Sequence, residues 1–142
     1  MKRVKIYDQA EDELLKFAVI IARYRGQWVF CKHWQRDTLE VPGGHREPGE
    51  DIEETARREL WEETGATDYT IRPVCVYSVS SQEETGEQES FGGLYFAEIA
   101  KLERELHSEI EKIILTDELP GRWTYPDIQP ELLAEAGRRG FF

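Results

Sequence analysis

The 142-residue sequence is poor in several kinds of residue, and each shortage excludes a class of protein. It has two cysteines, Cys31 and Cys75, which lie far apart with no Cys or His partner at metal-ligand spacing. A disulfide scaffold and a structural zinc site are therefore excluded, and both cysteines are expected to be reduced core residues. No apolar run reaches the roughly 18 residues of a membrane span, and no apolar segment follows the basic residues near the N-terminus. The expected compartment is the cytoplasm.

Basic residues are also scarce, with 18 Lys and Arg against 29 Asp and Glu, which gives a net charge of -11. This charge disfavours binding to a nucleic acid polymer or to an anionic membrane, so cations would have to mediate the binding of any anionic ligand. Hydrophobic residues make up 39% of the chain, which is too many for a disordered acidic protein. The length fits a single domain over residues 1–142.

The N-terminal half begins with a predicted hairpin. Phe17–Ala22 and Gln27–Cys31 are apolar runs rich in strand-forming residues, and Arg25-Gly26 between them is typical of a turn. Pro42-Gly43-Gly44 then predicts an interruption of regular structure and a sharp bend, followed by a loop.

The most secure helix is predicted over residues 51–64, which contain neither Gly nor Pro. Asp51 is suited to the N-cap with Glu54 at the third helical position, and Gly65 is suited to the position after the helix end. Further strands are predicted over residues 69–80, 91–100 and 109–115, a polar loop over 82–89, and a second helix over 130–139. Strands interspersed with two helices predict an α/β fold in which helices cover a mixed sheet.

Three carboxylates of the predicted helix lie on or beside its apolar stripe. With Ile52 at zero and about 100° per residue, Glu59 falls at about 340°, Glu63 at about 20° and Glu62 at about 280°. An ordinary amphipathic helix would carry these groups on the opposite face. Carboxylates at this spacing repel one another unless a cation lies between them, and magnesium prefers such oxygen ligands together with substrate phosphates. A solvated acidic helix and a metal site for a phosphate ester or anhydride both remain open at this point.

A longer pattern surrounds these carboxylates. Gly44, five residues, Glu50, seven residues, Arg58-Glu59-Leu60, one residue, Glu62-Glu63, one residue, then Gly65 and Ala66 resembles the Nudix box. Ala66 departs from the bulky aliphatic residue that is usual there, which affects packing rather than a ligand. The resemblance implies an α/β/α sandwich with a mixed β-sheet and a pyrophosphohydrolase that uses Mg²⁺, with Mn²⁺ as an alternative.

Several residue roles follow from the resemblance. It implies that Glu59, Glu62 and Glu63 bind metal, with the Gly43 carbonyl as a further ligand and Glu50 as an auxiliary acid. Arg58 is expected to pair with a carboxylate of the box and to orient it. The general base is expected to be Glu59, with Glu109 before the late strand as the alternative.

Other residues are candidates for contact with the substrate. Arg46 and Lys32 are candidates for binding phosphate, because cations near the site would offset its acidic surroundings. His45, at a variable position of the box, is a weaker candidate. Trp34, Phe91 and Tyr95 are candidates for stacking on a base, although aromatic residues on strands more often belong to the core.

The substrate is less well defined than the reaction. Family members that cleave ADP-ribose usually carry a Pro about sixteen residues beyond the box, where this chain has Ser81, and the upstream signature of coenzyme A-cleaving members is missing. The chain resembles mutator-type members instead, a resemblance to which Asp117-Glu118-Leu119-Pro120 adds weakly. We therefore expect a small-molecule nucleotide substrate, a nucleoside triphosphate or its oxidised form, acted on by a monomer or homodimer.

Two alternatives belong to other classes of protein. One is a Nudix-fold regulatory module that binds a nucleotide without cleaving it, which the intact carboxylate set disfavours. The other is an acidic interaction domain that binds a basic partner, for which the sequence offers only its charge.

Overall fold

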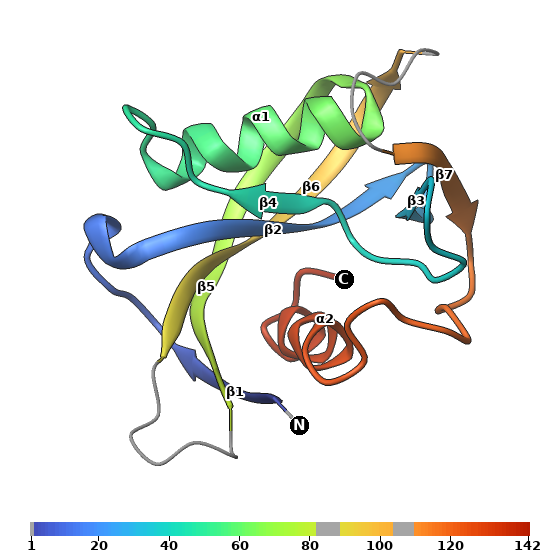
Figure 1. The fold of residues 1–142 in the computed structure, drawn as a ribbon. Helices are drawn as coiled ribbons and strands as arrows, with labels where there is room; N and C mark the ends of the chain where they lie inside the picture. The colour runs from blue at the N-terminus through green and yellow to red at the C-terminus, as the bar shows by residue number, and fades with distance from the viewer. Residues whose placement is uncertain (1, 82–88, 104–109) are drawn as a thin grey trace.

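The computed structural model describes residues 2–81, 89–103 and 110–142. The predicted loop over 82–89 lies almost wholly outside these residues, and so does Glu109. The described chain forms a seven-stranded mixed sheet with one helix on each face (Figure 1). Its strands are β1 (Lys2–Tyr7), β2 (Leu15–Tyr24), β3 (Gln27–His33), β4 (Gly43–His45), β5 (Ala66–Ser81), β6 (Ser90–Leu102) and β7 (Ile110–Thr116), and its helices are η1 (Asp12–Leu14), α1 (Ile52–Thr64) and α2 (Gln129–Arg138).

The predicted hairpin is confirmed as β2 and β3. Arg25 and Gly26 turn the chain with positive φ angles of 52° and 81°, the backbone that a two-residue hairpin loop requires. Beyond the turn the edge of β2 is shared, because Phe17 to Val19 of β2 pair with β4 instead of β3. The sheet therefore divides along β2, and β4 pairs with β2 while it also contacts α1.

The prediction that Pro42-Gly43-Gly44 interrupts regular structure is wrong for the two glycines. Gly43 and Gly44 belong to β4 and pair with Val19 and Ala18 of the neighbouring strand. Glycine is a weak strand former, but pairing with an available strand edge outweighs that preference here. The lack of a side chain allows β4 to approach both β2 and α1 closely.

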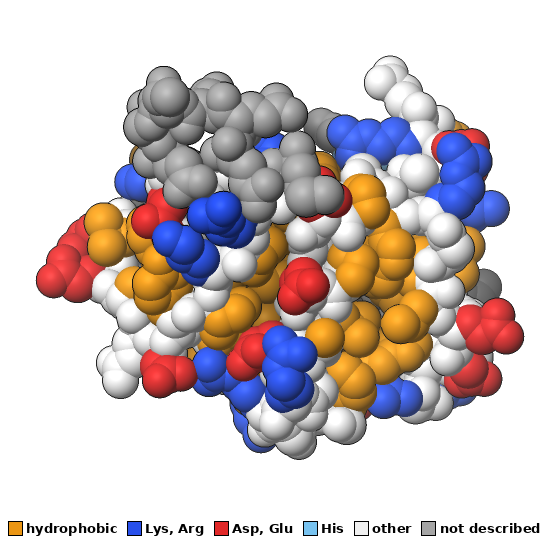
Figure 2. Space-filling model, turned by 90° about the horizontal axis from the view of Figure 1, so that it is seen from below, with side chains coloured by type: hydrophobic (Ala, Val, Ile, Leu, Met, Phe, Trp, Pro, Cys, Tyr) orange, Lys and Arg blue, Asp and Glu red, His pale blue; other side chains and the backbone are white. Residues whose placement is uncertain are grey.

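The sheet order is β1-β5-β6-β2-β3-β7, and the β2–β6 pairing is parallel while the others are antiparallel. Two hydrophobic clusters cover its faces. One includes Ile52, Ala56 and Leu60 of α1, and the other includes Leu132 and Leu133 of α2. The predicted α/β/α sandwich with a mixed β-sheet is therefore confirmed. Hydrophobic side chains also gather over much of the face seen from below (Figure 2).

The ends of α1 follow the sequence prediction. The Asp51 side chain accepts a hydrogen bond from the Glu54 backbone N–H at 2.8 Å, and the Glu54 side chain accepts one from the Asp51 N–H at 3.2 Å. Gly65 ends the helix with a φ of 79°. The helix predicted over residues 130–139 is confirmed as α2. No described helix has the length and hydropathy that would allow it to cross a membrane.

Candidate active site

A cleft of about 920 Å³ lies beside β4 and α1. One part of its lining is acidic and consists of Glu40, Glu59, Glu62 and Glu63. Residues from β2, from β5 and from the segment leading into α2 complete the walls, among them Phe17, Tyr77 and Tyr125. The division of the sheet at β2 thus leaves an open space next to the helix that carries the box carboxylates.

The phase of α1 turns two carboxylates inward. Glu59 is 9% exposed and Glu63 is 8% exposed. They lie on the buried side of the helix together with Ile52, Ala56 and Leu60. The Gly43 N–H donates a hydrogen bond to Oε1 of Glu63 at 2.8 Å, which ties β4 to the helix. The apolar stripe and the acidic face overlap, as the spacing along the helix predicts.

Arg58 joins the carboxylates of the box. Its Nε donates to Glu50 at 2.6 Å, and its Nη1 donates to Glu59 at 2.8 Å and to Glu62 at 3.1 Å. Its Nη2 donates to the carbonyl oxygen of His45 at 2.9 Å. The hydrogen bond from Arg58 lowers the pKa of Glu50 to about 2. Arg58 thus holds Glu50 as a carboxylate and links α1 to the loop that precedes it.

Burial has the opposite effect on the inward-facing acids. It raises the pKa of Glu59 to about 7, an effect to which a hydrogen bond with Glu62 adds. Burial also raises the pKa of Glu63 to about 8, against the lowering effect of the Gly43 N–H. Two acids that are this poorly solvated would ionise fully at neutral pH only with further positive charge nearby.

The donor set fits a hard divalent cation. It consists of carboxylate oxygens at a place where the backbone of Gly44 leaves room, because a Cβ at Gly44 would collide with the Glu59 carboxylate. Across residues 2–81, 89–103 and 110–142, no three His, Cys, Asp or Glu side chains already form a metal-binding group. Arg58 bridges Glu59 and Glu62 in this arrangement.

Glu40 was missed by the sequence analysis. It is 6% exposed and lies 3.4 Å from Nε2 of His33 and 3.3 Å from Nη1 of Arg36. Its charge contributes to the raised pKa of Glu63, so the two acids lie in one electrostatic environment. The signal in the sequence that could have identified Glu40 is its place as an acid between the apolar residues Leu39 and Val41, just before Pro42.

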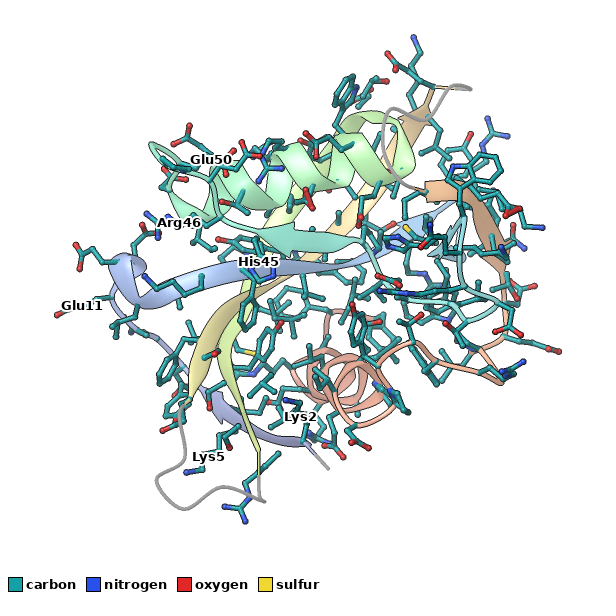
Figure 3. The ribbon with its side chains drawn as sticks, in the orientation of Figure 1. Lys2, Lys5, Glu11, His45, Arg46 and Glu50 are labelled. Carbon is teal, nitrogen blue, oxygen red and sulfur yellow. The ribbon has the colours of Figure 1, made fainter. Side chains whose placement is uncertain are left out.

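The two predicted phosphate-binding cations do not line the cleft. Arg46 pairs with Asp12 at 2.6 Å and donates to the backbone of Glu50 at 2.7 Å, where the chain leaves β4 (Figure 3). Lys32 pairs with Glu111 at 2.7 Å. His45, in contrast, does line the cleft, and its ring lies edge-on to Phe17.

The predicted base-stacking residues also lie elsewhere. Trp34 is 66% exposed, Phe91 packs against Tyr7, and Tyr95 is buried in the core. None of the three lines the cleft described above. Its aromatic lining consists of Phe17, Tyr77 and Tyr125.

A mixed sheet between two helices, with buried carboxylates beside a cleft, defines the chain as an α/β domain with an acidic site. The family model described as NUDIX domain matches residues 14–133. The chain belongs to the Nudix family, which confirms the resemblance of its box and the prediction of a Nudix pyrophosphohydrolase.

The relatives agree with this assignment. The chain is 36% identical over 114 residues to a Bacillus subtilis protein provisionally named 8-oxo-dGTP diphosphatase YtkD, covering 80% of this chain and 69% of that protein. The crystal structure of a point mutant of the B. subtilis pyrophosphohydrolase BsRppH is 29% identical with a TM-score of 0.80, covering 99% and 92% of the two chains. A Nudix hydrolase from Nitrosomonas europaea shares the fold, with 15% identity, a TM-score of 0.68 and coverage of 87% and 89%.

Proposed function

We propose that this protein hydrolyses a nucleoside triphosphate, including oxidised purine forms, to a nucleoside monophosphate and pyrophosphate in a reaction that depends on Mg²⁺ or Mn²⁺. The observation that carries the proposal is the burial of Glu59 and Glu63 beside Glu62 on the wall of the cleft. The 36% identity to YtkD, named for 8-oxo-dGTP, supports the choice of substrate.

The residues that would hold the cation are Glu59, Glu62 and Glu63, together with the carbonyl oxygen of Gly43. When bound, a divalent cation supplies a Lewis acid that polarises the phosphate and lowers the pKa of water. The three carboxylates supply the negative charge that keeps the cation in place.

The chain's own groups would then have two tasks. Glu59, favoured over Glu109, would accept the proton of the attacking water, because its buried carboxylate lines the cleft beside Glu62 and Glu63. Arg58 and Glu50 would orient the carboxylates through the network of hydrogen bonds described above. Glu109 lies outside the described residues.

The fold offers no sign of a covalent route through either cysteine. Cys31 and Cys75 are both buried, and burial raises the pKa of each thiol, so neither is a ready nucleophile. We therefore propose direct attack of water on a phosphorus of the diphosphate. A cytoplasmic monomer or homodimer that acts on small nucleotides, not on nucleic acid polymers, belongs to the same proposal.

A nucleotide panel tests this function. The purified protein is incubated with the common nucleoside triphosphates, 8-oxo-dGTP, ADP-ribose and a dinucleoside polyphosphate, with Mg²⁺ or with EDTA. The release of phosphate and pyrophosphate is measured, and the binding of each nucleotide is measured separately by calorimetry. We expect the protein to release pyrophosphate from a nucleoside triphosphate in Mg²⁺ but not in EDTA. Nucleotide binding without turnover would indicate the regulatory module. If the protein neither binds nor hydrolyses any nucleotide, the acidic interaction domain would be the remaining alternative.

A further inference from the structure

A nucleotide polyphosphate would bring several negative charges to a cleft lined by four carboxylates. A divalent cation would offset only part of this repulsion, so a side-chain cation with unused hydrogen-bond donors is needed at the cleft. Two described Lys or Arg residues line it, Lys2 and Arg36. This inference rests on the proposed function, because it concerns how the same site holds its substrate.

The other arginines near the carboxylates have their donors occupied. All three nitrogens of Arg58 donate to the box or to the His45 carbonyl. Arg46 uses Nε, Nη1 and Nη2 on the Glu50 carbonyl, the Asp12 carbonyl and the Asp12 carboxylate. A guanidinium has five N–H donors, and these two arginines direct theirs at the protein itself.

Arg36 differs in this respect. Its side chain is 45% exposed, and one nitrogen lies 3.3 Å from Glu40. A hydrogen bond with Tyr125 also raises the pKa of Arg36. No further side-chain partner of Arg36 occurs within the described part of the chain, so the remaining donors of its guanidinium are open to the cleft that Arg36 and Tyr125 line.

The loop that carries Arg36 is anchored. The Leu39 N–H donates a hydrogen bond to the Arg122 carbonyl at 3.0 Å, and the Leu39 carbonyl accepts one from the Thr124 N–H at 2.9 Å. The hydroxyls of Thr38 and Thr124 lie 2.7 Å apart. Glu40, at the end of the same loop, is buried in the acidic lining, so its ion pair holds Arg36 next to that lining.

Lys2 is less well placed. It lies on β1, well away from α1 and its carboxylates (Figure 3). Its charge would therefore meet another part of a bound nucleotide. We propose that Arg36 binds the polyphosphate chain of the substrate, with Glu40 and Tyr125 as the residues that position its guanidinium.

The alternative is that Arg36 only neutralises buried Glu40. Adding Arg36→Gln to Glu40→Gln separates the two roles, because Glu40→Gln leaves no carboxylate to neutralise, so a further loss of binding on removal of Arg36 reports its contact with phosphate. Arg36→Lys restores the charge but lacks the planar guanidinium group that can donate two parallel hydrogen bonds. Arg122→Gln is the matched control, because Arg122 is 71% exposed, pairs with Asp37 and does not line the cleft.

Inorganic tripolyphosphate in Mg²⁺ is the probe, with affinity measured by calorimetry below the melting temperature of each variant. We expect Arg36→Gln to weaken binding at least about tenfold, the effect of losing one charge-assisted contact. Arg36→Lys should recover part of the loss, and Arg122→Gln should bind as wild type does. Binding by Arg36→Gln within twofold of wild type, or an equal loss in Arg122→Gln, would overturn the proposal.

Kinetics distinguish a failure of this inference from a failure of the proposed function. With the nucleotide found by the panel, Arg36→Gln should raise KM while kcat stays within a few fold. Turnover with an unchanged KM would reject the role of Arg36 and retain the function. Loss of tripolyphosphate binding in Arg36→Gln, in a protein that hydrolyses no nucleotide, would reject the function and retain the phosphate-binding role.

Discussion

The carboxylate of Glu59 lies where a side chain on Gly44 would begin, so β4 and α1 meet with no room for a Cβ atom between them. Gly44→Ala should therefore displace the end of the Glu59 side chain and leave the backbone in place, because a flexible carboxylate moves more easily than a paired strand. A misplacement of about 1 Å in an active site costs on the order of 10²-fold in rate. We expect that loss in kcat, with a melting temperature near that of wild type.

Gly121→Ala is the control for this substitution. A Cβ at Gly121 meets no atom within 4 Å, and its φ is not positive. The control should retain wild-type activity. Full activity in Gly44→Ala would show that the position of Glu59 does not matter for the reaction.

The response to magnesium tests the metal ligands directly. A cation that binds only the folded protein raises its stability, by about 2.7 kcal/mol at 100 times its dissociation constant. The wild type should therefore melt at a higher temperature in Mg²⁺ than in EDTA. Changing Glu62 and Glu63 together to Gln should abolish this rise, whereas Glu53→Gln should preserve it because Glu53 pairs with Arg57 on the exposed side of α1. A full rise in the double variant would place the cation elsewhere.

The raised pKa values of Glu59 and Glu63 predict how the metal-free protein responds to pH. An acid whose pKa is higher in the folded state than in the unfolded state favours folding at low pH, and this contribution is lost as pH rises through the folded pKa. The loss should fall between the ordinary value of 4.5 and about 7 for Glu59 or about 8 for Glu63. The lowered pKa of Glu50 affects stability only below this window.

Denaturant unfolding in EDTA across pH 4.5 to 8 measures this effect. The free energy of unfolding should fall with pH in the wild type, and the fall should be smaller in Glu63→Gln, which lacks the buried acid. Equal slopes for the two proteins would show that Glu63 ionises in the folded protein as it does in solvent.

The sequence alone predicts α1 and the orientation of its carboxylates, because the residues that determine both lie close together along the chain. Asp51, Glu54 and Gly65 set the ends of the helix within a few residues, and the period of the helix fixes which way Glu59 and Glu63 face. The hairpin was predicted for the same reason, since its turn lies between adjacent strands.

Features that depend on distant partners were not predicted. β1 is an edge strand that begins with two basic residues, and it forms because β5 offers its edge. Gly43 and Gly44 become a strand because β2 diverges from β3. Arg46 is expected at the phosphate because a cation near the site would offset its acidic surroundings, yet Asp12, which is 34 residues away along the chain, engages its guanidinium. The same fold brings Glu40 and Arg36 to the cleft.

The final prediction concerns the base. Glu59→Gln preserves the shape of the side chain and removes its charge, so the fold should persist while turnover falls by about 10²- to 10⁴-fold, the effect of losing a general base. Turnover within a few fold of wild type would reject Glu59 as the base, and Glu109→Gln would then be the next variant to measure. Hydrolysis in heavy-oxygen water would show which phosphorus is attacked, because direct attack places the label in one product. A phosphorylated or nucleotidylated protein trapped during turnover would exclude direct attack by water.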